Sequence, residues 1–211
     1  MSRLFEQLLR VRGADGDFLC PKYESCIDPL LLPDVGAAVE RLRSAIDGNE
    51  RVMIYGDYDV DGVTASAVMY DTLKLAGIKE VRVMLPNRFT DGYGMSKKLV
   101  QEAIESRVNL VFTVDCGSRN FEIIAELKRA GIDTIVTDHH ECEETLPEAV
   151  AVINPKRRDC VVEDDLRNLA GVGVAFKFAQ ALVRADLIPE GQEKWLLDLV
   201  VLGTVCDSML L

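Results

Sequence analysis

Residues 52–62, VMIYGDYDVDG, join an apolar run directly to three alternating carboxylates and a glycine. The apolar run predicts a buried strand, and the composition of residues 63–76 predicts a helix directly after it. Like charges spaced this closely repel one another. We therefore expect a cation among Asp57, Asp59 and Asp61. The stretch predicts a strand–turn–helix unit that carries half of a divalent metal site.

The composition is that of an ordinary globular protein, with 211 residues, 48% hydrophobic and 28% charged. No apolar run is long enough to cross a membrane, and residues 1–12 lack a signal-peptide core, so we expect a cytoplasmic location. The six cysteines form no CxxC pair, and we expect free thiols. The net charge of −11 argues against a protein that coats nucleic acid through its overall field. It is compatible with a nucleic-acid enzyme whose acids are neutralised by metal ions.

Strand-like and helix-like segments alternate along the rest of the chain. Residues 1–33 are expected to form an N-terminal arm that lies over the domain. Asp34 is expected to cap a helix that Gly48 ends. Five apolar strands separated by helices predict an α/β fold for residues 34–211, a doubly wound, mainly parallel five-stranded sheet of order 2-1-3-4-5 with C-terminal helices. The expected strands are 51–55, 81–85, 110–114, 132–136 and 150–153, and the later helices are 63–76, 96–106, 119–130, 175–185 and 193–201.

Polar residues follow the third and fourth strands as well as the first. In a doubly wound sheet the ligand lies beyond the carboxyl ends of the strands, where strand order reverses. Asp115 is placed there to bridge two ions about 3.5–4 Å apart, and Asp59 and Asp61 to reach one ion each. His139 can add an imidazole ligand. His140 is expected to point away from the ions, since neighbours on an extended chain face opposite ways.

Each of these features alone has another interpretation. The three acids could form a solvated or calcium-type turn, Asp115 could be a turn residue or helix cap, and the histidine pair could lie on the surface. The pair contains the only two histidines in the chain, however, and follows a strand beside the other acids. A shared metal site explains the coincidence better. The spacing of Gly171 and Gly173 is weak evidence for a phosphate-binding turn, and close helix packing is the favoured interpretation.

Four segments together resemble the motifs of the DHH phosphoesterase superfamily. They are YGDYDVDGVT at 55–64, VDCG at 114–117, DHH at 138–140 and LGTVCD at 202–207. The chain is also similar, from residue 4 to its end, to the DHH catalytic lobe of RecJ-type single-strand DNA exonucleases. The segments that carry this similarity are DP at 28–29, LP at 32–33, RF at 88–89, DGYG at 91–94, NP at 154–155 and LAGVGVAFK at 169–177.

The resemblance implies a role for each matching residue. Two Mn²⁺ or Mg²⁺ ions would be bound, one by Asp59 and Asp115 and the other by Asp115 with the remaining ligands. Water activated by the paired ions would attack phosphorus in line, and His140 would hold the scissile phosphate. The implied metal ligands are Asp59, Asp61, Asp115, His139 and Asp207. The implied catalytic residues are His140, Asp115 and two groups that would orient ligands, Asp57 and Asp138.

The implied reaction is hydrolysis of single-stranded DNA from the 5′ end to mononucleotides, in repair and recombination. A single-strand binding protein and a helicase are candidate partners. Tyr93 could stack on a base or serve packing, and the basic residues 156–158 could contact the strand or form a solvated loop. The implied substrate contacts are Arg88, Asn154, His140, Tyr93, Arg119 and Lys156.

The chain departs from the family pattern in two places. Tyr55 stands where many superfamily members have a metal-ligating histidine, so the first ion is expected to be held more weakly. RecJ-type proteins continue past the last aspartate into a DHHA1-type domain and often an OB-fold. Because both are absent from this chain, we expect a catalytic lobe that binds DNA weakly alone, with a Kd of about 10⁻⁴–10⁻⁶ M.

Two other functions remain open. A DHH phosphodiesterase for short oligonucleotides or cyclic dinucleotides is disfavoured by the arm and by residues 88–94. A non-catalytic replication scaffold is disfavoured because all five implied metal ligands are present.

Overall fold

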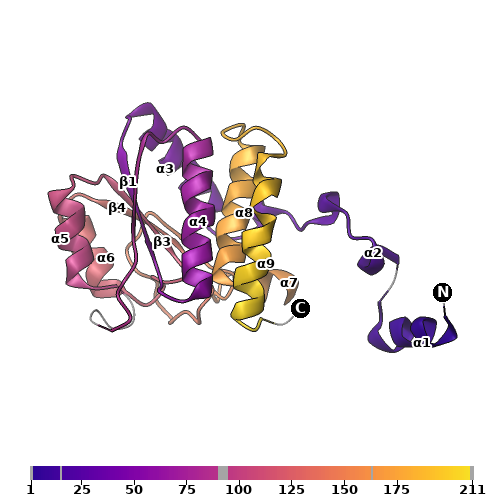
Figure 1. Cartoon of the computed structure of the whole chain (residues 1–211). Coiled ribbons are helices and arrows are strands. Elements are labelled where there is room, and N and C mark those ends of the chain that lie inside the picture. The colour runs from indigo at the N-terminus through magenta and orange to yellow at the C-terminus, as the bar shows by residue number, and fades with distance from the viewer. Residues whose placement is uncertain (1, 15, 90–94, 163, 210–211) are drawn as a thin grey trace.

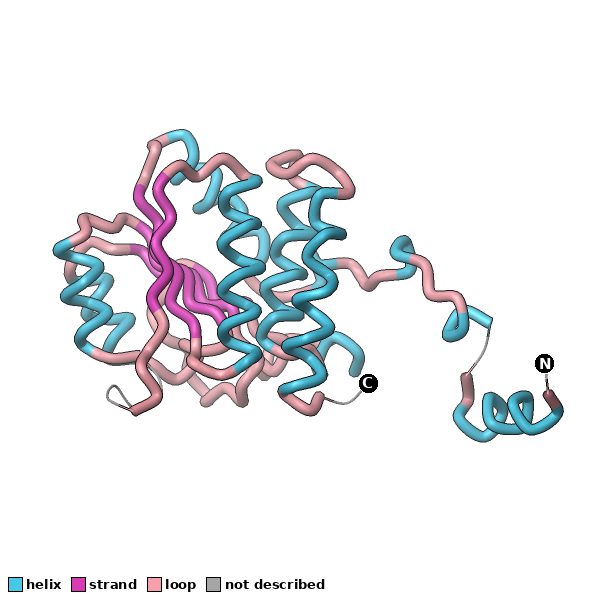
Figure 2. The backbone as a smooth tube through the Cα atoms, in the orientation of Figure 1, coloured by secondary structure: helices cyan, strands magenta, loops and turns pink. Residues whose placement is uncertain are grey.

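The computed structural model describes residues 2–14, 16–89, 95–162 and 164–209. Its five strands form one sheet of order β2-β1-β3-β4-β5, in which every neighbouring pair is parallel. Figure 2 shows the strands side by side in the middle of the domain. The predicted fold class and strand order are therefore confirmed. The strands are β1 (Arg51–Gly56), β2 (Glu80–Met84), β3 (Leu110–Val114), β4 (Asp133–Thr137) and β5 (Ala151–Ile153).

Helices cover both faces of the sheet (Figure 1). One core joins the sheet to α3 (Val35–Asp47), α4 (Val60–Leu75) and α8 (Gly171–Arg184), and α9 (Leu197–Cys206) packs beside α4 and α8. The other core joins the sheet to α5 (Lys97–Glu105) and α6 (Phe121–Arg129). None of the described helices is long and apolar enough to cross a membrane. The remaining described helices are α1 (Arg3–Arg12), α2 (Gly16–Leu19), η1 (Tyr23–Ser25), η2 (Pro29–Leu31), α7 (Asp164–Arg167) and η3 (Gln192–Leu196).

Successive residues of β1 point into the two cores, as the pleat of a strand requires. Val52 and Ile54 belong to the core under α3, α4 and α8, while Met53 and Tyr55 belong to the core under α5 and α6. All four are essentially inaccessible to solvent. The six cysteines are free thiols, as expected.

Three helices, α4, α8 and α9, extend toward the strand ends beyond the bounds that their sequence patterns predicted. α4 begins at Val60 because Asp59 is its N-cap, with Oδ1 accepting the Gly62 N–H at 2.9 Å. α8 begins four residues before the expected Ala175, and α9 continues to Cys206. As a result, Asp61 lies in the first turn of α4 and Asp207 at the end of α9.

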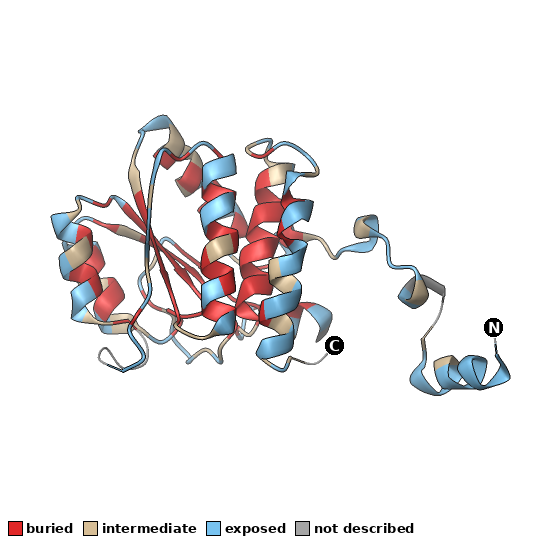
Figure 3. Ribbon diagram, in the orientation of Figure 1, coloured by how far each residue is buried: buried red, intermediate tan, exposed pale blue. Residues whose placement is uncertain are grey.

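The N-terminal arm packs on the domain only in its second part. The Tyr23 hydroxyl accepts a hydrogen bond from Gln180 at 3.0 Å, and the Ile27 carbonyl accepts one from Lys177 at 2.7 Å. By contrast, α1 has no buried residue and stands away from the body together with α2 (Figures 1 and 3). The expected contact of the arm with the domain was therefore right near η1 and η2 and wrong for α1 and α2.

Asp34 occupies the N-cap position of α3, but its side chain makes no capping hydrogen bond. Its Oδ2 instead accepts the Val152 N–H at 3.0 Å and pairs with Arg157. Arg157 is buried and is also bound by Asp159. This guanidinium therefore fastens β5 to α3, and the expectation that it belonged to a basic surface beside Lys156 was wrong.

Candidate metal centre

The carboxyl ends of β1, β3 and β4 and the end of α9 bring acids and imidazoles together. Asp115 belongs to two groups of side chains whose ligand atoms lie within 4.8 Å of one another. Ligands from four separate parts of the sequence thus meet at one place. The strand order predicted this for the three strand ends, and the family resemblance implied it for Asp207. The groups are Asp57, Asp59 and Asp115; Asp61, His139 and Asp207; and Asp115, His139 and His140.

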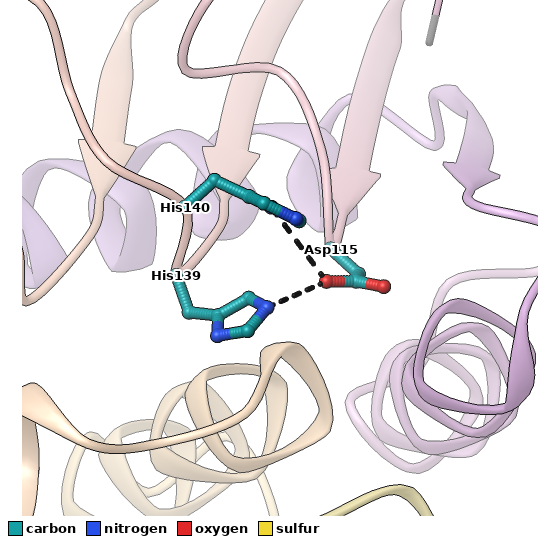
Figure 4. A group of neighbouring side chains, drawn as sticks. All are labelled: Asp115, His139 and His140. Atoms are coloured by element: carbon teal, nitrogen blue, oxygen red, sulfur yellow. Dashed lines mark ion pairs between the residues drawn. The ribbon is translucent and has the colours of Figure 1, made fainter. Parts of the chain in front are cut away.

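Asp115 lies in the middle of the cluster, directly after β3. Its backbone has a φ of 58°, in the left-handed region, and its N–H donates to the Thr137 carbonyl at 2.9 Å. This turn directs the carboxylate toward both histidines (Figure 4). Oδ1 lies 3.1 Å from His139 Nε2 and 3.9 Å from His140 Nδ1.

The Asp115 carboxylate has the environment of a metal ligand. The residue is 1% exposed, and Oδ1 has no hydrogen-bond partner in the described part of the chain. Burial, together with the charges of Asp61 and Asp59, raises the pKa of Asp115 to about 10. A buried acid among other acids is unfavourable unless a cation compensates it. This orphaned oxygen fits a divalent ion.

Asp61 is fixed by the first turn of α8. Its Oδ2 accepts the Gly171 N–H at 2.6 Å, and its Oδ1 accepts the Val172 N–H at 2.8 Å. The first N–H groups of a helix lack intrahelical partners and carry positive partial charge. The anion at this turn is thus the protein's own carboxylate. A Cβ on Gly171 would lie 2.6 Å from Asp115 Oδ1, so close packing is confirmed there.

His139 connects Asp115 to the ligands on α4 and α9. Its Nε2 lies 3.7 Å from an oxygen of Asp61 and 3.7 Å from an oxygen of Asp207. These separations are too long for hydrogen bonds but surround a common point. Burial lowers the pKa of His139, which favours the neutral imidazole that binds metals.

His140 also faces the cluster, contrary to expectation. The His139 and His140 rings are 4.6 Å apart at their centroids, and both follow the end of β4 at Thr137, with a bend in the chain at His140. His140 Nδ1 lies 2.8 Å from Asp138 Oδ1. This hydrogen bond raises the pKa of His140 to about 9. The side chain is 40% exposed, so a cationic imidazole faces the open side of the cluster.

Asp138 supports this arrangement from the interior. Its carboxylate accepts the N–H groups of Ser118 at 2.9 Å, His139 at 2.8 Å and His140 at 3.1 Å. Burial raises the pKa of Asp138, but the interaction with the His140 ring and the backbone donors outweigh it and lower the pKa to about 2. Asp138 therefore orients the two histidines, in the position that the sequence predicted.

We predict that Asp138→Asn moves the pKa of His140 from about 9 toward the ordinary value of about 6.5. The variant loses the negative charge that stabilises the imidazolium, so His140 becomes neutral near pH 8. An NMR titration of the imidazole resonances in metal-free protein measures this change. Asp71→Asn, at an exposed position, is the control, and equal pKa values in the two variants would contradict the assignment.

Asp57 lies closer to the metal position than expected. It is 4% exposed, its Oδ1 accepts the Tyr58 N–H at 2.6 Å, and it groups with Asp59 and Asp115 as a set of possible ligands. Burial raises the pKa of Asp57. Tyr55 points into the core under α5 and α6. Its side chain therefore supplies no metal ligand in place of the histidine that many family members have at this position. The first ligand set is carboxylate only.

A groove of about 700 Å³ opens beside the cluster, and its walls include Asp59, Asp61 and Asp207. Arg88 also lines it, with Cζ 4.9 Å from the centre of the Tyr58 ring. A guanidinium stacked on a tyrosine keeps its N–H groups available at the edge. Arg88 therefore lies beside the cluster, and the phosphate contact that the resemblance implies for it stays a prediction.

The other expected substrate contacts lie less favourably. Asn154 is inaccessible: its Nδ2 donates to Ser118 Oγ at 2.8 Å and to the His140 carbonyl at 2.9 Å. Its Oδ1 accepts the Lys156 N–H at 2.8 Å. The prediction that Asn154 contacts the DNA strand was therefore wrong, because both the NH₂ and the oxygen of its amide are bonded inside the protein. Lys156 Nζ lies 3.8 Å from a Glu141 oxygen. Arg119 is exposed, and Tyr93 lies outside the described residues.

Residues 51–204 match the N-terminal domain of the DHH family. The chain is 43% identical over 191 residues to the single-stranded-DNA-specific exonuclease RecJ of Dickeya dadantii, covering 86% of this chain and 33% of that protein. It is 39% identical over 209 residues to RecJ of Bacillus subtilis, covering 97% of this chain and 25% of that protein.

Two solved structures share the fold. An exonuclease RecJ bound to manganese superposes with a TM-score of 0.76 at 32% identity, covering 87% of this chain and 46% of that one. RecJ from Thermus thermophilus in complex with Mn²⁺ superposes with a TM-score of 0.74 at 28% identity, covering 94% of this chain and 27% of that one. The chain spans a third or less of the curated relatives' length. Since the family match extends over most of the chain, the protein belongs to the DHH family, and residues 51–204 are the N-terminal domain of that family.

Proposed function

We propose that this chain is the catalytic lobe of a metal-dependent phosphodiesterase that hydrolyses single-stranded DNA from the 5′ end to mononucleotides, in DNA repair and recombination. Residues 1–33 serve as the arm and residues 34–211 as the catalytic domain. The observation that carries the proposal is the orphaned carboxylate of Asp115, shared between ligand groups on both sides. The names of the curated relatives, single-stranded-DNA-specific exonucleases, support the substrate.

The ligand sets fit two divalent ions. Asp57, Asp59 and Asp115 would hold one, and Asp115 would share the second with the set on α4, β4 and α9, namely Asp61, His139 and Asp207. Carboxylates with one imidazole suit Mn²⁺ and Mg²⁺, and the two solved relatives contain Mn²⁺. When bound, the ions supply an activated water and neutralise charge on the phosphate.

The chain's own residues position the substrate between two cationic groups. His140, kept protonated by Asp138, donates to an oxygen of the scissile phosphate, and such charge-assisted bonds are short and strong. Arg88, which lines the groove beside the cluster, binds phosphate there and is held in place by Tyr58. The turn at Gly171 fixes Asp61, so the ligand does not swing away as charge develops on the phosphate.

A comparison of substrates tests this proposal. In the presence of Mn²⁺, the protein is expected to release mononucleotides from a long 5′-phosphorylated single strand faster than from the same sequence as a duplex or from a dinucleotide. A preference for the dinucleotide would favour the short-oligonucleotide alternative. Absence of hydrolysis on every substrate would favour a non-catalytic scaffold that works with a helicase or a single-strand binding protein.

Mn²⁺ is expected to stabilise the fold strongly, because it relieves repulsion among the buried acids. At a free concentration 100 times Kd the gain is about 2.7 kcal/mol, which raises Tm by roughly 5–10 °C for a chain of this size. Thermal melts in MnCl₂ measure the shift, with NaCl at equal ionic strength as the control. Titration calorimetry is expected to count two ions per chain, and a single ion would contradict the shared role of Asp115.

A further inference from the structure

A second cavity lies at the opposite end of the domain from the metal centre. It has a volume of about 790 Å³ and lies between η1 of the arm, the C-terminal end of α8 and the loop into η3. α8 starts at the metal centre with Gly171 and reaches this cavity at Arg184. Those 14 residues span about 20 Å. The cavity shares no lining residue with the groove beside the metal centre.

One oxygen of a buried carboxylate in the wall of this cavity lacks a hydrogen-bond partner among the described residues. Glu193 is 2% exposed, and its Oε2 has no hydrogen-bond partner within the described residues. The hydroxyl of Tyr23 is hydrogen-bonded to the Glu193 carboxylate. The same hydroxyl accepts a hydrogen bond from Gln180 Nε2 at 3.0 Å. A buried carboxylate oxygen without a donor is unfavourable. The site is therefore complete only when something donates to Oε2.

The charges around the cavity favour a cationic donor. Glu24, Asp186 and Glu190 also line it, and none of them has an ion-pair partner in the part of the chain that the structure describes. The two basic lining residues are both engaged. Arg184 is bound by Asp28 at 2.7 Å, and Lys194 Nζ lies 4.3 Å over the Tyr23 ring.

The rest of the wall is apolar. Ile27, Pro29, Leu187, Ile188 and Pro189 line the cavity next to the polar groups. A ligand that fits this combination has a charged donor at one end and a hydrocarbon stem behind it, since long basic side chains bury their stems and expose their heads.

We propose that this cavity is a second binding site, for an ammonium or guanidinium group on a methylene stem, with Glu193 as its anchor. The ligand joins the arm to the domain, because Tyr23 belongs to η1 and Glu193 to η3. The same chemistry is carried by free polyamines and by the lysine or arginine side chains of a polypeptide. The proposal goes beyond the proposed function and does not depend on hydrolysis.

Titration calorimetry with agmatine and putrescine tests the site, with saturating Mg²⁺ present so that the amines do not occupy the acids of the metal centre. The wild-type protein is expected to bind both amines, and 1-butanol, which lacks the charge, is expected not to bind. Glu193→Gln keeps the shape of the side chain and is expected to weaken binding at least tenfold. Glu143→Gln, an equal change of charge at an exposed position, is expected to leave it unchanged.

NMR shift mapping on the wild-type protein keeps the test independent of the folding of any variant. Agmatine is expected to shift the backbone amides of residues 23–29 and 186–194. Failure to bind, equal affinity in the two glutamine variants, or shifts elsewhere would overturn the proposal. A peptide of residues 2–14, which carries Arg10 and Arg12 on a helix without buried residues, is the polypeptide probe. Competition between it and agmatine identifies a polypeptide source, and agmatine binding alone identifies a free amine.

Discussion

Asp115→Asn is expected to abolish hydrolysis and at the same time to stabilise the metal-free protein. The activity falls on the order of 10³-fold or more, because a neutral amide replaces the one carboxylate that both ligand sets share. The fold suffers little, since asparagine tolerates the left-handed backbone at this position, with its φ of 58°. The two effects therefore have opposite signs.

The stabilisation follows from the pKa of Asp115. A carboxyl whose pKa is raised to about 10 in the folded protein, from about 3.9 when unfolded, holds its proton in the fold. Stability is then fully present below the unfolded pKa and is lost as pH rises toward the folded pKa. The asparagine variant does not have this loss. We expect the free energy of unfolding of the variant to exceed that of the wild type by about 1–3 kcal/mol at alkaline pH, the scale of one unsatisfied buried group.

Urea unfolding of both proteins after chelation, at pH 6 and pH 9, measures this difference. The wild type is expected to lose stability between the two pH values by more than the variant. With Mn²⁺ added, the wild type is expected to become more stable than the variant, since only the wild type retains the shared ligand. Asp71→Asn, at an exposed position, is the control for a lost acid. Hydrolysis at the wild-type rate by Asp115→Asn would disprove the shared role.

The sheet and most of the metal ligands were predictable because both follow from local patterns. Buried parallel strands appear as short apolar runs, and the carboxyl ends of parallel strands meet at one edge. That rule alone brings Asp115 and His139 to the acids after β1. Asp207 needed the family resemblance, since nothing in the local pattern of α9 indicates which residue faces the cluster.

The details that were missed depend on contacts between distant segments. His140 turns toward Asp115 because the backbone leaves the strand at Thr137, where periodicity gives no signal. Asn154 is held inside the protein by a hydrogen bond to Ser118, 36 positions away in the sequence. The GxG at 171–173 was interpreted as close packing rather than as an anion-binding turn, and only the structure shows that this turn also binds the Asp61 carboxylate.

Gly171→Ala is expected to reduce kcat by about 10²-fold, the scale of a misplacement of about 1 Å at a catalytic group. An added Cβ would lie 2.6 Å from both Cβ and Oδ1 of Asp115. Either the carboxylate or the first turn of α8 must move, and that turn also holds Asp61 through the Gly171 N–H. Both ligand sets are disturbed by one methyl group, while the cationic groups that bind phosphate stay in place. KM is therefore expected to change much less than kcat.

Gly36→Ala is the matched control, because a Cβ at that helical position meets nothing within 4 Å. It should stabilise α3 by up to about 1 kcal/mol and leave kcat unchanged. Gly203→Ala approaches the same site from α9, where its Cβ would lie 2.9 Å from Asp61 Oδ1 and 2.5 Å from Thr64 Oγ1. The same Cβ would lie 2.7 Å from Val172 Cγ1 in the first turn of α8. Loss of Mn²⁺ affinity in both variants would therefore show that the packing of this turn against Asp61 limits the metal centre. Normal kcat and normal Mn²⁺ affinity in Gly171→Ala would mean that the turn of α8 only packs against the site and does not position its ligands.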